Sequence, residues 1–93
     1  MSVKSIVRSL TKSDIIAFRR LLEIMGDKNE ISIIIGEAVE GTNISRSAFG
    51  AMLSKLRFAG VIESRSCGRN GVYIRILDRD AIDGMVNVLD MIY

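Results

Sequence analysis

Residues 43–77 read NISRSAFGAMLSKLRFAGVIESRSCGRNGVYIRIL, and the first half of this stretch has the pattern of a helix. Ser45 is a good helix N-cap, because its hydroxyl can accept a hydrogen bond from a free backbone N–H. The large apolar residues that follow recur every three to four positions, as they do on one face of a helix. These residues are Phe49, Met52, Leu53 and Leu56. The pattern predicts a helix that ends at Phe58-Ala59-Gly60.

The second half of the stretch has the pattern of a β-hairpin. Val72, Ile74 and Ile76 alternate with Tyr73 and Arg75, which is the period of a half-buried strand. The preceding run, Val61 to Arg65, predicts the partner strand, and Gly68, Asn70 and Gly71 predict the turn between the two strands. Gly60 alone separates helix and hairpin, so we expect the hairpin to lie beside the helix.

Three further segments flank this stretch. Thr11 followed by Asp14 forms a helix-opening box, and the apolar spacing after it predicts a helix over 12–25. Residues 31–35 form a short β-branched run that we interpret as a brief strand passing directly into a helix that ends near Gly41, although a run this short is also compatible with a helix. Asp80 is the expected cap of a last helix over about 80–92.

The order of these elements predicts the fold class. Two helices joined by a short glycine-containing turn form a helix-turn-helix, here at about 33–58, and a hairpin directly after it forms a wing, here at about 61–77. We therefore predict an α+β, mostly α, winged helix-turn-helix with a three-helix core, a β-hairpin wing and a C-terminal helix. No proline, repeat or low-complexity stretch indicates a linker, so residues 1–93 are expected to form a single domain.

Charge is unevenly distributed along the chain although the net charge is only +2. Residues 1–43 contain six basic and six acidic side chains, whereas residues 44–79 contain seven basic and two acidic ones. Residues 80–93 contain three acidic and no basic side chains. Clustered arginine and lysine on one module are typical of a protein that binds a phosphate backbone.

The composition argues against several other classes of function. The chain has no histidine, which is the commonest general base and zinc ligand, and no nucleophile–base pair is recognisable, so we expect no enzyme. The acidic residues Asp78, Asp80 and Asp83 are better explained by helix capping than by metal binding, and no cofactor is expected. A single cysteine, Cys67, fits a reducing cytoplasm, and no apolar run is long enough to span a membrane.

The same stretch resembles the C-terminal DNA-binding domain of the CodY family of nutrient-responsive global transcriptional repressors. The closest agreement lies in ISRS at 44–47, AGVIESRS at 59–66 and the G-x-x-G-x-Y-I pattern at 68–74, and SLTKSDIIAF at 9–18 resembles the opening of that domain. The resemblance implies a winged helix-turn-helix that binds double-stranded DNA, with a homodimer as the expected assembly. It also implies a GAF-type sensor domain that binds branched-chain amino acids, for which 93 residues leave no room. The chain is then either an excised domain or a short relative.

The expected DNA-binding residues lie on the second helix of the motif and on the wing. On the helix, Arg46 and Ser47 are expected near base edges or phosphates, Ser54 on the same outward face and Lys55 at a phosphate. The expected contacts of the wing are Arg65, Arg69 and Arg75, with Arg69 at its tip. Charged residues on a hairpin also protect sheet edges against aggregation, which is the alternative interpretation.

Two features limit the comparison with the family. Ala51 and Ser54 stand where the family typically has an asparagine and an arginine, so we expect fewer base contacts here. Cys67 stands where the family has an apolar residue, and we interpret it as a structural filler.

The small number of base-contacting side chains on the outward face of the second helix keeps open an alternative function, a winged helix for protein–protein contact or dimerisation. Helix 12–25 is apolar on more than one side, which favours a partner.

Overall fold

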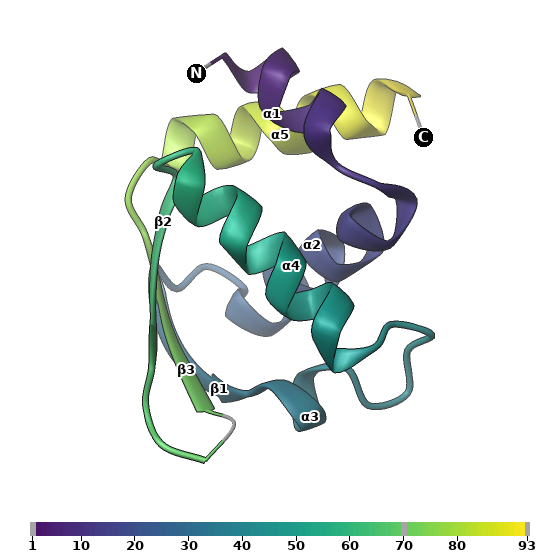
Figure 1. Cartoon of the computed structure of the whole chain (residues 1–93). Helices are drawn as coiled ribbons and strands as arrows, with labels where there is room; N and C mark the ends of the chain where they lie inside the picture. The colour runs from purple at the N-terminus through teal and green to yellow at the C-terminus, as the bar shows by residue number, and fades with distance from the viewer. Residues whose placement is uncertain (1, 70, 93) are drawn as a thin grey trace.

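The computed structural model describes residues 2–69 and 71–92, in which five helices pack together with a small antiparallel sheet that lies at one side of the molecule (Figure 1). The elements are α1 (Val3–Ser9), α2 (Lys12–Met25), β1 (Glu30–Ile34), α3 (Ile35–Ala38), α4 (Arg46–Phe58), β2 (Ile62–Ser66), β3 (Gly71–Ile76) and α5 (Arg79–Ile92). The winged helix-turn-helix class is confirmed. No helix in the described part of the chain combines the length and apolar character needed to cross a membrane.

Helix α2 has the predicted bounds and the predicted cap. The Thr11 hydroxyl accepts a hydrogen bond from the Asp14 backbone N–H at 3.1 Å, and the Asp14 carboxylate accepts one from the Thr11 N–H at 2.8 Å. Phe18 is fully buried, and Leu21 and Met25 nearly so. The apolar surplus expected on this helix is mostly absorbed by the core, and only Ile16 is classed as exposed. This helix therefore gives less support for a partner than its sequence indicated.

The ambiguous run at 31–35 is a strand that passes directly into a helix. β1 pairs with β3 in antiparallel register, with Ile31 opposite Ile74. The helix that follows, α3, is only four residues long and ends at Ala38, so the expected end near Gly41 was wrong. The chain turns there because the Thr42 hydroxyl donates a hydrogen bond to the Val39 carbonyl at 2.6 Å, and Gly41 adopts a φ of 78°.

A glycine-based cap joins α4 to the wing. The Gly60 N–H donates to the Arg57 carbonyl at 3.0 Å, and the Val61 N–H donates to the Leu56 carbonyl at 3.2 Å. This is a Schellman motif, which needs a residue with positive φ, and Gly60 has a φ of 77°. Leu56 and Val61 are both buried. The wing therefore begins at a fixed angle to α4.

The wing is a hairpin within a three-stranded sheet of order β1-β3-β2. Ile62 lies opposite Ile76 and Ser64 opposite Ile74, so the core-facing side chains alternate as predicted. At the tip, the Cys67 N–H donates to the Gly71 carbonyl at 3.1 Å, and Gly68 has a φ of 89°. The expected turn residue Asn70 lies outside the described residues.

Helices at the two ends of the chain form a layer, and the sequence predicted only one of these two helices. Helix α5 was expected, whereas α1 was not, and the two pack together (Figure 1). Gly84 of α5 permits this contact, because a Cβ there would lie 3.2 Å from a methyl carbon of Val3. The cap of α5 was assigned to the wrong residue: Asp78 accepts the Ala81 N–H at 3.0 Å, and Asp80 lies in the first turn.

Candidate nucleic-acid interface

The first turn of α4 places two of the predicted residues in solvent. The Ser45 hydroxyl accepts the Ala48 N–H at 3.0 Å and so fixes the start of the helix. Arg46 and Ser47 follow immediately, and both are exposed. In Figure 1 this end of α4 lies at the same end of the molecule as α3 and the tip of the wing, far from α1 and α5. The helix start and the wing tip therefore lie at the same end of the molecule.

The outward face of α4 carries small side chains near the start of the helix and an aromatic side chain at its end. Ser47 and Ala51 are exposed and Ser54 is half-buried, so little side-chain bulk covers this part of the helix. At the C-terminal end of the same stripe Phe58 is 83% exposed, with the Arg57 guanidinium carbon 5.8 Å from its ring centre. Arg57 was not among the predicted residues, although helical spacing from Ser54 could have indicated it.

Lys55 is directed into the fold. Its ammonium pairs with the carboxylate of Asp14 and donates to the Ser9 carbonyl at 3.0 Å, which ties α4 to the start of α2. The Asp14 side chain is 4% exposed and that of Lys55 35%. Burial raises the pKa of Asp14, but hydrogen bonds from Lys55 and Thr11 outweigh it, so the pKa lies below its ordinary value. The predicted phosphate contact at Lys55 would require the ammonium to leave these two partners.

Two of the three wing arginines also have partners. Glu63 lies 3.1 Å from Arg75 and 3.8 Å from Arg65, measured between carboxylate oxygen and guanidinium nitrogen. Arg65 also covers the ring of Tyr73 at 4.9 Å, and the Tyr73 hydroxyl donates to Glu30 at 2.7 Å. That hydrogen bond raises the pKa of Tyr73. The outer face of the sheet is therefore a network of mixed charge rather than a uniformly basic surface.

Arg69 differs from the other wing arginines. It is exposed at the tip, and among residues 2–69 and 71–92 no carboxylate lies within ion-pair distance of it. The same holds, within those residues, for Arg46 and Arg57. Within residues 44–79, three arginines therefore have no acidic partner among the described residues. Two of them lie on α4 and one lies on the wing tip.

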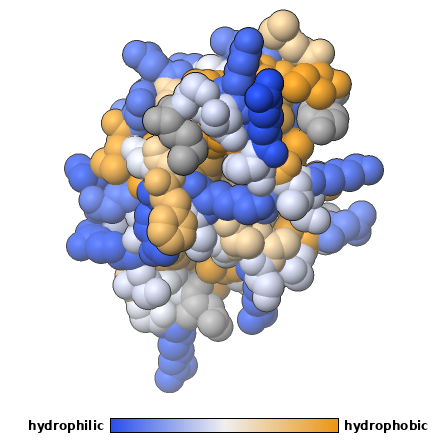
Figure 2. Space-filling model, turned by 45° about the horizontal axis from the view of Figure 1, so that its top comes forward, coloured by the Kyte–Doolittle hydropathy of each residue, from blue (hydrophilic) through white to orange (hydrophobic). Residues whose placement is uncertain are grey.

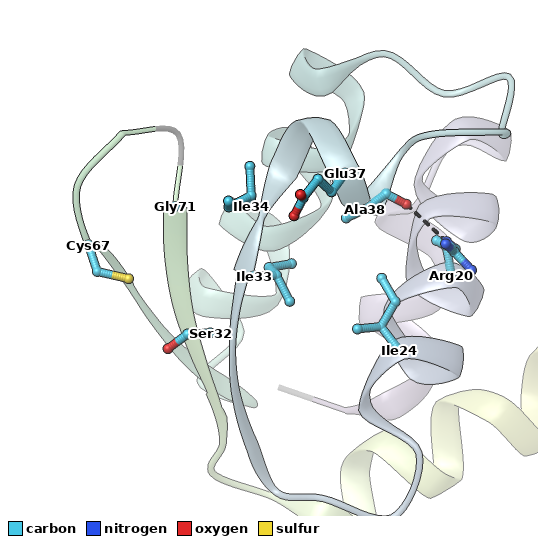
Figure 3. Close-up of a pocket in the computed structure, with 9 residues that line it drawn as sticks. All are labelled: Arg20, Ile24, Ser32, Ile33, Ile34, Glu37, Ala38, Cys67 and Gly71. Atoms are coloured by element: carbon cyan, nitrogen blue, oxygen red, sulfur yellow. Dashed lines mark hydrogen bonds between the residues drawn. The ribbon is translucent and has the colours of Figure 1, made fainter.

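A cavity lies beside this end of the molecule, between β1, α2 and α3 (Figure 3). Its volume is about 450 Å³, and apolar side chains such as Ile24 and Ile33 line much of it. The Arg20 guanidinium at its wall already donates to the Ala38 carbonyl at 2.9 Å and to Glu23 at 3.1 Å. Cys67 lies at its rim and is exposed, so the thiol does not fill the core as expected.

The described residues lack the features of a metal site, and the face drawn in Figure 2 shows no broad apolar patch. They contain no group of three or more histidine, cysteine, aspartate or glutamate residues placed to hold a metal. Figure 2 brings the α1–α5 end toward the viewer, and its apolar atoms form separate groups among hydrophilic ones. On that face the described residues offer no single apolar patch.

Comparison with known proteins is consistent with this architecture. A family described as the CodY helix-turn-helix domain matches residues 31–88, the part that runs from β1 into α5. The chain belongs to this family. The predicted resemblance is therefore confirmed, and the family is one of transcription-regulator domains rather than of enzymes.

Several full-length relatives match as well. The chain is 33% identical over 86 residues to the global transcriptional regulator CodY of Lysinibacillus sphaericus, covering 92% of this chain and 33% of the relative. It is 38% identical over 76 residues to CodY of an Exiguobacterium species, covering 82% of this chain and 29% of the relative. CodY of Clostridium beijerinckii is 33% identical over 86 residues. The chain spans about a third of the length of these relatives.

Proposed function

We propose that this chain is a DNA-binding domain of a transcription regulator and that it acts as a repressor by occupying duplex DNA. The observation that carries the proposal is that the start of α4, which bears the exposed Arg46 and Ser47, and the wing tip, which bears the exposed Arg69, lie at the same end of the molecule. Membership of the CodY helix-turn-helix family supports it, because such a motif places its second helix in the major groove.

The proposed residues have different roles. Arg46 offers a planar fork that can donate two hydrogen bonds to guanine, and Ser47 can donate to a base or a phosphate. The small side chains of Ala51 and Ser54 let α4 approach the groove floor but read few bases. Arg69 neutralises a phosphate or enters the minor groove. Arg65 and Arg75 are weaker contributors, because each would share its charge with Glu63.

The assembly around the domain is part of the same proposal. The family resemblance supports a homodimer and a separate sensor domain for branched-chain amino acids, and a cytoplasmic location where DNA is accessible. In that arrangement the sensor would change the affinity of the domain for its operator.

Binding to duplex DNA as a function of salt tests the proposal. A protein that neutralises phosphates releases counterions, so fluorescence anisotropy should show affinity falling steeply as salt rises. Arg46→Ala and Arg69→Ala should each weaken binding at least five-fold, by about 1 kcal/mol or more. Arg8→Ala is the matched control, because Arg8 is an exposed arginine on α1 at the other end of the molecule. Equal effects of all three variants, or no binding at low salt, would contradict the proposal.

A protein–protein module is the second candidate, and the exposed Phe58 favours it. An aromatic side chain that is 83% exposed on the outward face of α4 is typical of an interface residue. Sedimentation at several concentrations tests it. Self-association that Phe58→Ser abolishes would support this candidate, and a monomer at all concentrations would count against self-association.

A further inference from the structure

Gly36, the second residue of α3, lies directly beneath the side chain of Arg46. A Cβ at position 36 would lie 2.9 Å from Nη2, 3.1 Å from Cζ and 3.2 Å from Nε of Arg46. Real Cβ atoms essentially never approach so closely, so this contact exists only because residue 36 has no side chain. Gly36 is one of the described glycines without a positive φ, and its backbone conformation is therefore no reason for a glycine there.

The orientation of the guanidinium group follows from these distances. Nε, Cζ and Nη2 are nearly equidistant from the Cβ position, as they are when a planar group turns its face toward it. The N–H groups of a guanidinium lie in its plane, so they point along the surface and not into α3. Among the described residues, no hydrogen bond or ion pair engages the Arg46 side chain. Its donors are therefore available to a ligand.

We propose that Gly36 is a positioning residue. It lets the Arg46 guanidinium lie flat against α3 and so holds its N–H donors in the orientation that meets DNA. The inference rests on the proposed function of Arg46. An arginine side chain carries large rotamer entropy, and part of this entropy is lost before binding when the group lies on a flat backbone surface. A methyl group at position 36 would occupy the space beneath the guanidinium and restore the rotamer freedom of the Arg46 side chain.

Gly36→Ala separates positioning from stability. The contacting atoms form the far end of a flexible side chain, which can swing away from a new methyl group. Alanine also has a higher helix propensity than glycine, so the variant should fold at least as stably as the wild type. We expect DNA affinity to fall about five-fold, the size associated with ordering one long side chain on binding.

A double-mutant cycle tests the proposal. Gly36→Ala should weaken binding in the wild-type background and have no effect in the Arg46→Ala background, because the arginine it acts through is absent. Unchanged or tighter binding by Gly36→Ala, or an equal loss in both backgrounds, would overturn the inference.

A second measurement distinguishes this failure from failure of the proposed function. In free protein, the NMR resonance of the Arg46 Nε–H should shift in Gly36→Ala. Gly50→Ala is the matched control, because a Cβ there meets no heavy atom within 4 Å. If Arg46→Ala binds DNA as well as the wild type, the proposed base contact of Arg46 is refuted. The NMR resonance then tests separately whether Gly36 holds the Arg46 side chain against α3. An unshifted resonance would overturn the inference that Gly36 positions the Arg46 side chain.

Discussion

Replacing Lys55 by methionine tests whether this residue stabilises the fold or binds DNA. The substitution keeps the length and apolar stem of the side chain and deletes the ammonium that pairs with Asp14. It leaves a carboxylate that is only 4% exposed without its cation. Breaking a fully buried pair costs about 3–5 kcal/mol, and since Lys55 is 35% exposed we expect about 2 kcal/mol of lost unfolding free energy. For a domain of this size that lowers the melting temperature by about 10 °C.

The effect should depend on pH in a direction set by Asp14. Its pKa is depressed in the folded protein, so in the wild type its contribution is present above the unfolded value, about 3.9, and is lost as pH falls through the folded pKa. Lys55→Met removes the pairing that favours the charged carboxylate. The difference between wild type and variant should therefore be largest near pH 7 and vanish once the pH has fallen through the folded pKa of Asp14 in the wild type, which lies below about 3.9.

Urea unfolding followed by circular dichroism at two pH values measures both effects. Lys28→Met is the matched control, because Lys28 is an exposed lysine with no ion pair among the described residues, and it should change stability by less than about 0.5 kcal/mol. Folded Lys55→Met should bind DNA with unchanged affinity and salt slope. Unchanged stability together with a salt slope smaller by about one would refute the reasoning and return Lys55 to the phosphate contacts.

Four further substitutions have clear expectations. Arg69→Ala should reduce the salt slope of DNA binding by about one and weaken all duplexes equally, which titrations of several sequences would show, whereas a sequence-dependent loss would mean base contact. Gly60→Ala should cost about 1 kcal/mol or more in urea unfolding, because alanine is strained at a φ of 77°; no loss would mean that the turn relaxes. Phe49→Ala should cost about 3–5 kcal/mol since Phe49 is fully buried, whereas Phe58→Ala should stay within about 0.5 kcal/mol. Equal melting temperatures for the last two variants would contradict the assigned core.

Local signals explain which elements the sequence predicts well. α2 and α4 have capping residues and a helical period of apolar residues within a single stretch, and both were found at the expected positions. α1 has only seven residues, of which two are buried, so its period is too short to recognise. The Asp78 cap was missed because three aspartates follow one another closely and only the turn geometry selects among them.

Tertiary placement explains the contacts at the candidate site that the sequence does not indicate. Lys55 lies on the flank of α4, and nothing local indicates that a carboxylate 41 positions away in sequence will face it. The same limit applies to Arg65 and Arg75, whose shared partner Glu63 depends on strand register. Arg46 and Arg69 were predicted to lie at the interface from helix and hairpin patterns, but the contact between Arg46 and Gly36 appears only when α3 and α4 are packed.

The connection through Gly60 has a consequence for any DNA site that this domain occupies. Backbone hydrogen bonds join the end of α4 to β2, β2 to β3, and β3 back to β1, which continues into α3. Among the described residues, the end of α4 and the wing are therefore linked by the α4 cap and the sheet ladder, and the sheet continues through β1 into α3, which packs on α4. Two contacts held in this way have a fixed separation along the double helix. If both regions contact DNA as proposed, inserting one base pair between their two sites should weaken binding, because the fold sets the spacing of the two contacts.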